Sequence, residues 1–278
     1  MTGNDSNGTA SETGGGAIWN VGNVYLDGCT FDSNTAQKDG GAVWHSNGSG
    51  ATPEFAACIF TGNTAKFSGG AVYEKSDSAN VIYLNSLFVG NKAMGSTGNE
   101  GGGAIYAGGD PMTAYINCTF VGNEARTGQG GGMRVRDNES PIVTNCIFWD
   151  NCVGNDCTTQ DEDAQIHISG SGNNDSVTHS TLEGCADPGF CEDVDDANTA
   201  VEPTFAGAGL PHPYALTDVP ANAPLIDDGD GAESTHGTCP SVNESGEDLA
   251  GNSRFVHKDG VCVSSDANFV DMGAYEVQ

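Results

Sequence analysis

The chain has 278 residues and is strongly acidic, because 38 Asp and Glu residues against 9 Lys and Arg residues give a formal net charge of −29. A surface of that sign repels nucleic acid and anionic lipid, so neither is expected as a partner. The sequence has no apolar run long enough for a membrane span, and its 37% hydrophobic residues suffice for the core of an all-β domain.

Two short phrases alternate along the first half of the chain, with a period of roughly 30 residues. The first, F-x-x-N, occupies residues 31–34, 60–63, 88–91, 120–123 and 148–151. The second, GGA followed by Ile or Val and an aromatic residue, occupies residues 15–19, 40–44, 69–73 and 102–106, with a worn copy, GGMRV, at 131–135. A fixed period of this length is typical of solenoids, in which each repeat forms one coil.

Each repeat is expected to hold two or three short strands, each pairing in parallel with its copy in the next coil. Alternation before F-x-x-N predicts that Ile116, Cys118 and Phe120 share one face of a strand. Phe would then stack on Phe, and Asn on Asn at an inner turn, where a ladder of amides satisfies buried polar groups. The paired Gly residues allow tight corners. The sequence therefore predicts an all-β solenoid of about six to seven coils.

The two ends of the chain differ from these central repeats. The chain opens with MTGN, in which Met1 stands where later repeats have Phe, so we expect residues 1–183 to form an N-terminally truncated β-helix. After Asn151 the pattern decays into an irregular last coil, with Ser180 and Leu182 near the Cys and Phe positions. Residues 184–278 are expected to form an irregular, disulfide-stapled cap, because exposed strand edges promote aggregation.

The alternation of GGA[IV] with FxxN resembles the repeat of the polymorphic outer-membrane protein family, which implies a right-handed parallel β-helix, a pectate-lyase-like solenoid. In the tail, PLIDDGD at 224–230, DLAGNSR at 248–254 and VDMGAYE at 270–276 resemble the C-terminal region of choice-of-anchor bacterial surface β-helix proteins. The resemblances imply an exported protein, extracellular or at the bacterial cell surface. Neither a signal peptide nor an anchor is recognised in this chain.

One position of the repeat is aromatic in four successive copies, and Val135 takes that position in the fifth; the aromatic residues are Trp19, Trp44, Tyr73 and Tyr106. Strand neighbours face opposite sides, so the preceding β-branched residues lie on the other face; these are Ile18, Val43, Val72 and Ile105. Either the aromatic column is core, or it forms an exposed stripe on which sugar rings stack. The sequence leaves both arrangements open.

The 10 cysteines fall into two groups. Four recur in the repeats, with Ser86 in the missing place, and are expected to be small buried side chains whose redox state stays open; they are Cys29, Cys58, Cys118 and Cys146. The other six are spaced like disulfides of an oxidising, extracellular setting, pairing Cys152 with Cys157, Cys185 with Cys191, and Cys239 with Cys262.

Metal-binding and catalytic residues are less strongly indicated. The tail carboxylates Asp227, Asp248 and Asp271 recur in the three tail phrases, and they could bind Ca²⁺ or cap backbone N–H groups in turns. On the predicted strands, Arg134 and Arg136 alone form a basic pair pointing to one face, and Asp137 and Glu139 follow them. These four are the catalytic candidates if the protein is a polysaccharide lyase, which needs a base and cations beside a uronate carboxylate.

The expected function is a non-catalytic surface module for adhesion, with a polysaccharide or another host or cell-surface molecule as ligand. Two alternatives remain open. One is an enzyme that acts on an extracellular polysaccharide, as a lyase or a glycoside hydrolase, since β-helices carry such activities elsewhere but a fold does not establish a function. The other is a structural module that self-associates end to end.

Overall fold

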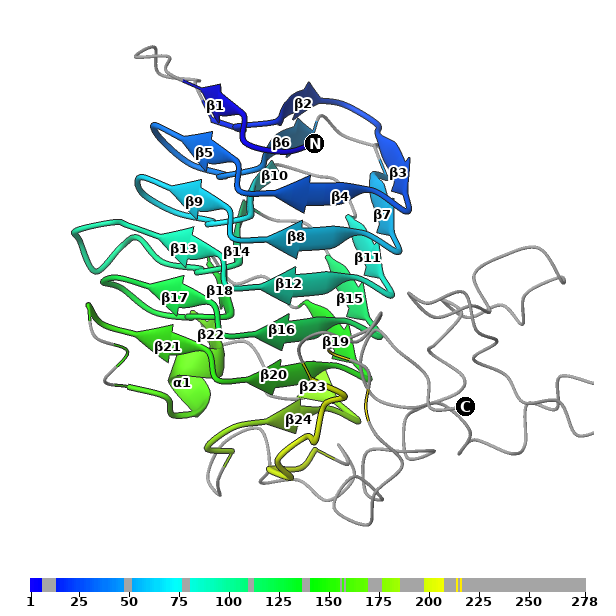
Figure 1. The fold of residues 1–278 in the computed structure, drawn as a ribbon, viewed down its shortest axis with the longest axis vertical. Coiled ribbons are helices and arrows are strands. Elements are labelled where there is room, and N and C mark those ends of the chain that lie inside the picture. The colour runs from blue at the N-terminus through cyan, green and yellow to red at the C-terminus, as the bar shows by residue number, and fades with distance from the viewer. Residues whose placement is uncertain are drawn as a thin grey trace, which may run out of the picture.

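The computed structural model describes residues 1–6, 14–47, 52–76, 81–109, 113–136, 141–155, 157, 159–169, 177–185, 198–207, 214 and 216. Within them the chain coils into a solenoid in which four six-stranded sheets run along the stack (Figure 1). Strands of successive coils pair in parallel, for example β8 with β12 and β12 with β16. This confirms the predicted all-β parallel solenoid, and it is consistent with a right-handed β-helix.

Each coil contributes one strand to each sheet. Sheet C contains β2 (Ile18–Val21), β6 (Val43–Asn47), β10 (Val72–Ser76), β14 (Ile105–Gly109), β18 (Met133–Val135) and β22 (Ile166–Ile168). Sheet D contains β3 (Tyr25–Asp27), β7 (Glu54–Ala56), β11 (Ile82–Leu84), β15 (Ala114–Ile116), β19 (Ile142–Thr144) and β23 (Val177–Thr178). Sheet A contains β4 (Thr30–Asp32), β8 (Ile59–Thr61), β12 (Leu87–Val89), β16 (Thr119–Val121), β20 (Ile147–Trp149) and β24 (Thr181–Leu182). Sheet B contains β1 (Asp5–Ser6), β5 (Thr35–Ala36), β9 (Thr64–Ala65), β13 (Lys92–Ala93), β17 (Glu124–Ala125) and β21 (Cys152–Val153).

The expectation of two or three strands per coil is wrong, because each complete coil has four. The strand that the pattern misses belongs to sheet B and directly follows the F-x-x-N turn, as β9 does. It is two residues long, which is too short to show an alternation in the sequence. Its pairing is nevertheless regular, with Thr64 opposite Lys92 and Ala65 opposite Ala93.

A column of Phe rings from sheet A runs through the core. Neighbouring rings in the column are nearly parallel, with centroids 4.5–4.8 Å apart; the rings belong to Phe31, Phe60, Phe88, Phe120 and Phe148. This spacing matches the separation of paired strands, so the backbone sets the stacking distance. All five side chains are buried, and burying each stabilises the fold by about 1.5–3 kcal/mol.

An Asn ladder runs beside the Phe column, and it is buried at every position except its exposed first residue, Asn4; it continues through Asn34, Asn63, Asn91 and Asn123 to Asn151. At each step the backbone N–H and the side-chain Nδ2 of one Asn donate to Oδ1 of the next, at 2.8–3.1 Å. From Asn63 onward, Nδ2 also donates to a Phe carbonyl of the preceding coil, as Asn91 does to Phe60 at 3.0 Å. One carboxamide therefore satisfies polar groups of three coils, which a hydrophobic residue could not do.

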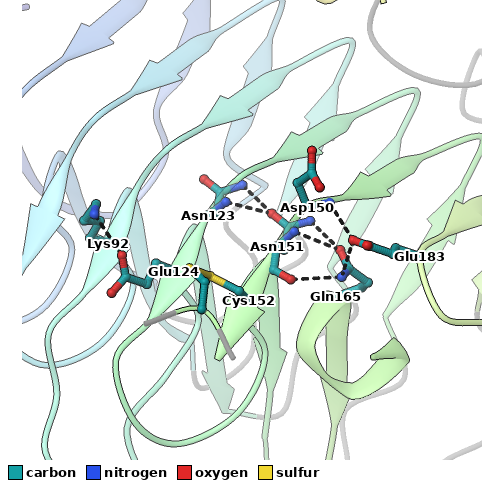
Figure 2. Close-up of a disulfide and its surroundings, with 9 residues drawn as sticks. Lys92, Asn123, Glu124, Asp150, Asn151, Cys152, Gln165 and Glu183 are labelled. Carbon is teal, nitrogen blue, oxygen red and sulfur yellow. Dashed lines mark hydrogen bonds and ion pairs between the residues drawn. A yellow bond between two sulfur atoms is a disulfide. The ribbon is translucent and has the colours of Figure 1, made fainter. Parts of the chain in front are cut away.

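The short helix α1 (Glu162–Gln165) closes the ladder at its C-terminal end. Oε1 of Gln165 accepts from the backbone N–H and Nδ2 of Asn151 at 3.2 and 2.8 Å (Figure 2). Its Nε2 donates to the carbonyl of Asn151 at 2.9 Å and to Oε2 of Glu183 at 3.3 Å. The side chain of Asp161 caps α1 by accepting from the backbone N–H of Ala164. Gln165 thus takes the role that the Asn of a further coil would have.

The corner between sheets D and A breaks the alternation of the strand that precedes F-x-x-N. Asn117 adopts φ of 54°, a left-handed conformation that Asn tolerates better than most residues. Tyr115, Cys118 and Phe120 consequently face the core, while Ile116 joins a separate cluster on the outer side of sheet D. The expectation that Ile116 shares a face with Cys118 and Phe120 is therefore wrong.

The same corner forms a second amide ladder. Asn145 Nδ2 donates to Asn117 Oδ1, and Asn117 Nδ2 donates to Asn85 Oδ1, both at 3.1 Å. All three residues have positive φ. Asn immediately before the repeated Cys or Ser is the sequence signal for this corner, in the phrases NS and NC.

The repeated cysteines are free thiols that serve the same corner. Cys118 Sγ lies 3.4 Å from the carbonyl oxygen of Ile116, two residues earlier, and Ser86 Oγ donates to the equivalent carbonyl of Leu84 at 3.0 Å. This shared role explains why Ser substitutes for Cys. Cys58, Cys118 and Cys146 are buried and Cys29 is half-buried. Burial raises the pKa of Cys58 to about 12.

The described part of the tail lies against the last coil. Thr199 accepts a backbone hydrogen bond from Leu182 and donates one to Ser180, both at 2.9 Å. Leu182 is the register partner of Phe148, so the last coil follows the expected alignment. Phe205 packs near Ile147 on the outer side of sheet A. Most of the predicted 184–278 cap lies outside the described residues.

Candidate functional site

The structure decides which column of the GGA phrase lies inside. Val43, Val72 and Ile105 are fully buried in the core, so the aromatic residues one position later lie on the outer side of sheet C. Strand pairing places Trp19 beside Trp44, Trp44 beside Tyr73, and Tyr73 beside Tyr106. We call these four side chains the aromatic face.

The rings of the aromatic face form two stacked pairs. Trp19 and Trp44 have centroids 5.5 Å apart and an interplanar angle of 10°, and Tyr73 and Tyr106 have centroids 5.0 Å apart and an angle of 8°. Access differs within each pair: Trp19 is 48% exposed and Tyr73 is half-buried, whereas Trp44 is 8% and Tyr106 is 5% exposed. Trp19 and Tyr73 are therefore the accessible rings, and Trp44 and Tyr106 support them.

The corner glycines fix the direction of this face. Gly40 has φ of 67°, and a Cβ there would lie 2.1 Å from the carbonyl oxygen of Val43. A Cβ on the neighbouring Gly41 would lie 2.0 Å from the carbonyl oxygen of Gly70 in the next coil. The first Gly is needed for its conformation and the second for the close approach of two coils. The turn then delivers Val43 inward and Trp44 outward.

The fifth copy of the GGA phrase is shifted by one residue from its predicted position. Gly130, with φ of 66°, takes the place of the first Gly, and Met133 takes the inward place beside Ile105. Arg134, and not Val135, is therefore the partner of Tyr106. Val135 lies in the core, so its expected place in the aromatic column is wrong. The fifth copy has three consecutive Gly residues, 130–132, so its Gly pair can be taken from the sequence as 130–131 or as 131–132.

Arg134 and Arg136 lie on this outer face, and the guanidinium of each donates hydrogen bonds to neighbouring coils. Arg134 is 4% exposed, and its guanidinium donates to the carbonyl oxygens of Gly98 and Glu100 at 2.8 and 2.5 Å. It therefore braces the segment before the GGA turn of the preceding coil. Arg136 donates to the hydroxyl of Tyr106 at 3.0 Å. The other catalytic candidates, Asp137 and Glu139, lie outside the described residues.

Sequence reasoning missed two buried ionisable residues on the inner side of sheet C. His45 and Glu74 are register partners in neighbouring coils and are 0% and 1% exposed. Burial lowers the pKa of His45 to about 4 and raises that of Glu74 to about 7, the latter partly offset by the nearby Tyr83 and Thr113 hydroxyls. The alternation of inward and outward side chains along the strands VWHSN and VYEKS could have revealed them. Once the Val residues are inside, the residues two positions later are inside too.

Of the predicted disulfides, one joins Cys152, the first residue of β21, to Cys157, with Cα atoms 4.9 Å apart (Figure 2). Cys185 is also disulfide-bonded. The remaining predicted disulfide and metal-binding residues lie outside the described residues; they are Cys191, Cys239, Cys262, Asp227, Asp248 and Asp271. The described residues contain no group of three or more His, Cys, Asp or Glu side chains that could hold a metal ion.

Comparison with known proteins supports the interpretation of the repeat. Residues 28–46, 57–73 and 85–108 match the family model of the Chlamydia polymorphic membrane protein repeat, so the predicted resemblance is confirmed within the central coils. No curated protein and no solved structure matches the chain. Across the described residues, no helix has the length and apolar character needed to cross a membrane. The repeat and the solenoid fold fit a surface β-helix module.

Proposed function

We propose that this protein is a non-catalytic surface module that mediates adhesion by binding glycan on its aromatic face. The observation that carries the proposal is the exposed Trp19 ring, which is stacked on Trp44 at the outer side of a continuous sheet. Aromatic rings supply large contact area with few torsions to restrict, so a ring already held by a stacking partner binds at low entropic cost.

The repeat match and the disulfide support a location outside the cell. Residues 28–108 contain the matched segments of a membrane-protein repeat, and Cys152–Cys157 is a bond favoured by oxidising compartments. We accordingly propose export to the bacterial cell surface or the extracellular space, with a polysaccharide or a host-surface glycan as ligand.

The test is depletion of the full chain from solution onto a panel of soluble and insoluble polysaccharides, with sugar release measured in the same samples. We expect depletion without reducing or unsaturated ends. Trp19→Ala should weaken binding by about 2- to 10-fold, the range expected of one aromatic contact. Tyr25→Ala is the matched control, because Tyr25 is 64% exposed in the same coil but lies on sheet D.

Two results would overturn this proposal. Sugar release would favour the lyase or hydrolase alternative and would direct attention to Arg136 and the acidic residues after it. Equal losses of affinity for Trp19→Ala and Tyr25→Ala would mean that exposed aromatic side chains of the first coil bind polysaccharide non-specifically and that the aromatic face has no special role.

We also propose Ca²⁺ as the ion that the tail carboxylates would bind, because carboxylate oxygens are its preferred ligands. Repeating the depletion and a thermal unfolding scan with chelator tests this. A fall in the unfolding temperature in chelator, restored by added Ca²⁺ and absent in Asp248→Asn, is expected. Identical unfolding temperatures with and without chelator would contradict the proposal that the protein binds Ca²⁺.

Self-association is a second candidate role, favoured by the distribution of exposed apolar side chains. The exposed large hydrophobic residues of the described chain all lie in the first coil; they are Met1, Trp19, Val21 and Tyr25. Gln165 closes the opposite end of the ladder, so association through these side chains would join the first coils of two copies of this chain. Light scattering over a concentration series should then show a dimer that Val21→Lys abolishes. A monomer at all concentrations would exclude this role.

A further inference from the structure

The outer side of sheet C has an unusual charge for a protein of net charge −29. None of its described outward strand positions carries a carboxylate; they are Trp19, Val21, Trp44, Ser46, Tyr73, Lys75, Tyr106, Gly108, Arg134 and His167. Arg136 follows on the same side, two residues after Arg134. The aromatic face is thus flanked by cations on a chain that is otherwise acidic.

Two of these cations lie beside the accessible rings. Lys75 is exposed on β10, two residues beyond Tyr73 and hence on the same side, about 6–7 Å along the strand. Arg136 donates to the hydroxyl of Tyr106, whose ring stacks on Tyr73 at 5.0 Å. The stacked pair therefore holds the Arg136 guanidinium close to the half-buried Tyr73 ring.

The basic side chains Arg134 and His167 on this side have partners within the protein. The Arg134 guanidinium is buried against backbone carbonyls, and Nδ1 of His167 is 2.5 Å from the carboxylate of Asp163. The remaining described Lys and Arg residues lie on β13 or in the segments that follow sheet B strands, where Lys92 pairs with Glu124 at 2.8 Å (Figure 2). Positive charge and accessible aromatic rings therefore coincide on the outer side of sheet C.

We propose that the ligand of the aromatic face is an anionic polysaccharide, with sugar rings stacked on Trp19 and Tyr73 and with carboxylate or sulfate groups held by Lys75 and Arg136. The inference rests on the proposed glycan-binding function and adds the class of ligand. The two rings are two coils apart, about 10 Å, so a chain laid along the stack meets Trp19 first, then Tyr73 with Lys75 on the same strand, and then Arg136 two coils further on. At physiological salt, charges more than about 8 Å apart are largely screened. The acidic remainder of the protein therefore repels an anionic ligand only weakly, while Lys75 and Arg136 attract its anionic groups at contact distance.

The decisive experiment compares polymers that differ only in charge. Polygalacturonate is paired with its fully methyl-esterified form, and dextran sulfate is paired with dextran. Affinities of the full chain are measured by affinity electrophoresis at 0.15 M NaCl with chelator present, which prevents bridging by divalent ions. We expect the charged member of at least one pair to bind about 5-fold tighter or more, as two contacts with exposed cations allow. The two pairs distinguish a carboxylate ligand from a sulfate ligand.

Variants then locate the charge contact. Lys75→Gln should weaken binding of the charged polymer about 2- to 5-fold and leave binding of its neutral partner unchanged. Trp19→Ala should weaken both. Lys92→Gln is the matched control, because it removes the same charge from an exposed side chain on sheet B. Arg136→Gln should behave like Lys75→Gln, with its unfolding temperature measured to separate binding from the loss of the bond to Tyr106.

Each outcome separates this inference from the function on which it rests. Preference for the charged polymers, reduced by Lys75→Gln and not by Lys92→Gln, supports the inference. Equal binding of charged and neutral polymers, weakened by Trp19→Ala, overturns it and leaves the glycan-binding function standing. Absence of binding to every polymer removes both. Equal losses for Lys75→Gln and Lys92→Gln would show a response to net charge and would overturn the assignment to this face.

Discussion

Replacing Glu74 by Gln should remove much of the pH dependence of the stability of the β-helix. The Glu74 carboxyl is 1% exposed, and Thr113 Oγ1 donates to its Oε2 at 3.3 Å. No hydrogen-bond partner of its Oε1 is found among the described residues. The ionisable residues around it are Tyr83, whose pKa burial also raises, and His45, whose pKa burial lowers to about 4. Its surroundings therefore favour the neutral acid.

The magnitude follows from the two states of this carboxyl. In the folded chain burial raises the pKa of Glu74 from 4.5 to about 7, so the folded state keeps its proton over a range in which the unfolded state loses it. The stability that this proton contributes is fully present below pH 4.5 and is lost as the pH rises through about 7. At about 1.36 kcal/mol per pH unit, the loss over that window is roughly 3 kcal/mol.

Denaturant unfolding of the wild type and Glu74→Gln between pH 4.5 and 8.5 measures this loss. Gln keeps an acceptor for Thr113 and resembles the neutral acid, so the two proteins should have similar unfolding free energies at pH 4.5. At pH 8 the variant should be more stable by roughly 3 kcal/mol. His45 is present in both proteins, so its loss of stability as the pH falls from 6.5 toward 4 cancels in the difference. A difference that stays constant with pH would refute the reasoning.

Two further predictions concern the columns inside the coils. Asn91→Ala should destabilise the fold by at least about 2 kcal/mol, because it removes the acceptor of the buried N–H of Asn63 and of one of its two Nδ2 hydrogens, and it leaves the Phe60 carbonyl without its Nδ2 donor. Asn4→Ala at the exposed end of the ladder should cost less than about 1 kcal/mol in the same unfolding assay. Equal losses would contradict the role of the ladder. Buried Cys58 should resist a thiol reagent in the native protein and react only after unfolding, whereas half-buried Cys29 should react first. Peptide mass spectrometry measures the labelling of each cysteine, and equal labelling of both in the native protein would contradict their difference in burial.

The candidate site was only partly predictable. All four members of the aromatic face were found from the sequence, because they recur at one position of a fixed repeat. The sequence did not predict which of these rings are accessible, since Trp19 and Trp44 occupy the same repeat position and differ only in what covers them. Arg134 was singled out as a catalytic candidate for its charge, but its bonds to distant carbonyls depend on how neighbouring coils stack.

The sequence by itself determined the solenoid, its period and its two central columns, Phe on Phe and Asn on Asn. A residue that recurs at the same place in every coil must meet its own copies, so a local pattern is enough. Only the tertiary structure decided which side of each strand faces the core, because that depends on the backbone at corners such as Gly40 and Asn117. The tertiary structure also placed Gln165 at the end of the Asn ladder and Glu74 beside His45. These contacts join residues at different positions of the repeat, or outside it. Which of them lie close together depends on the path of the backbone between coils, and the period of the sequence does not specify that path.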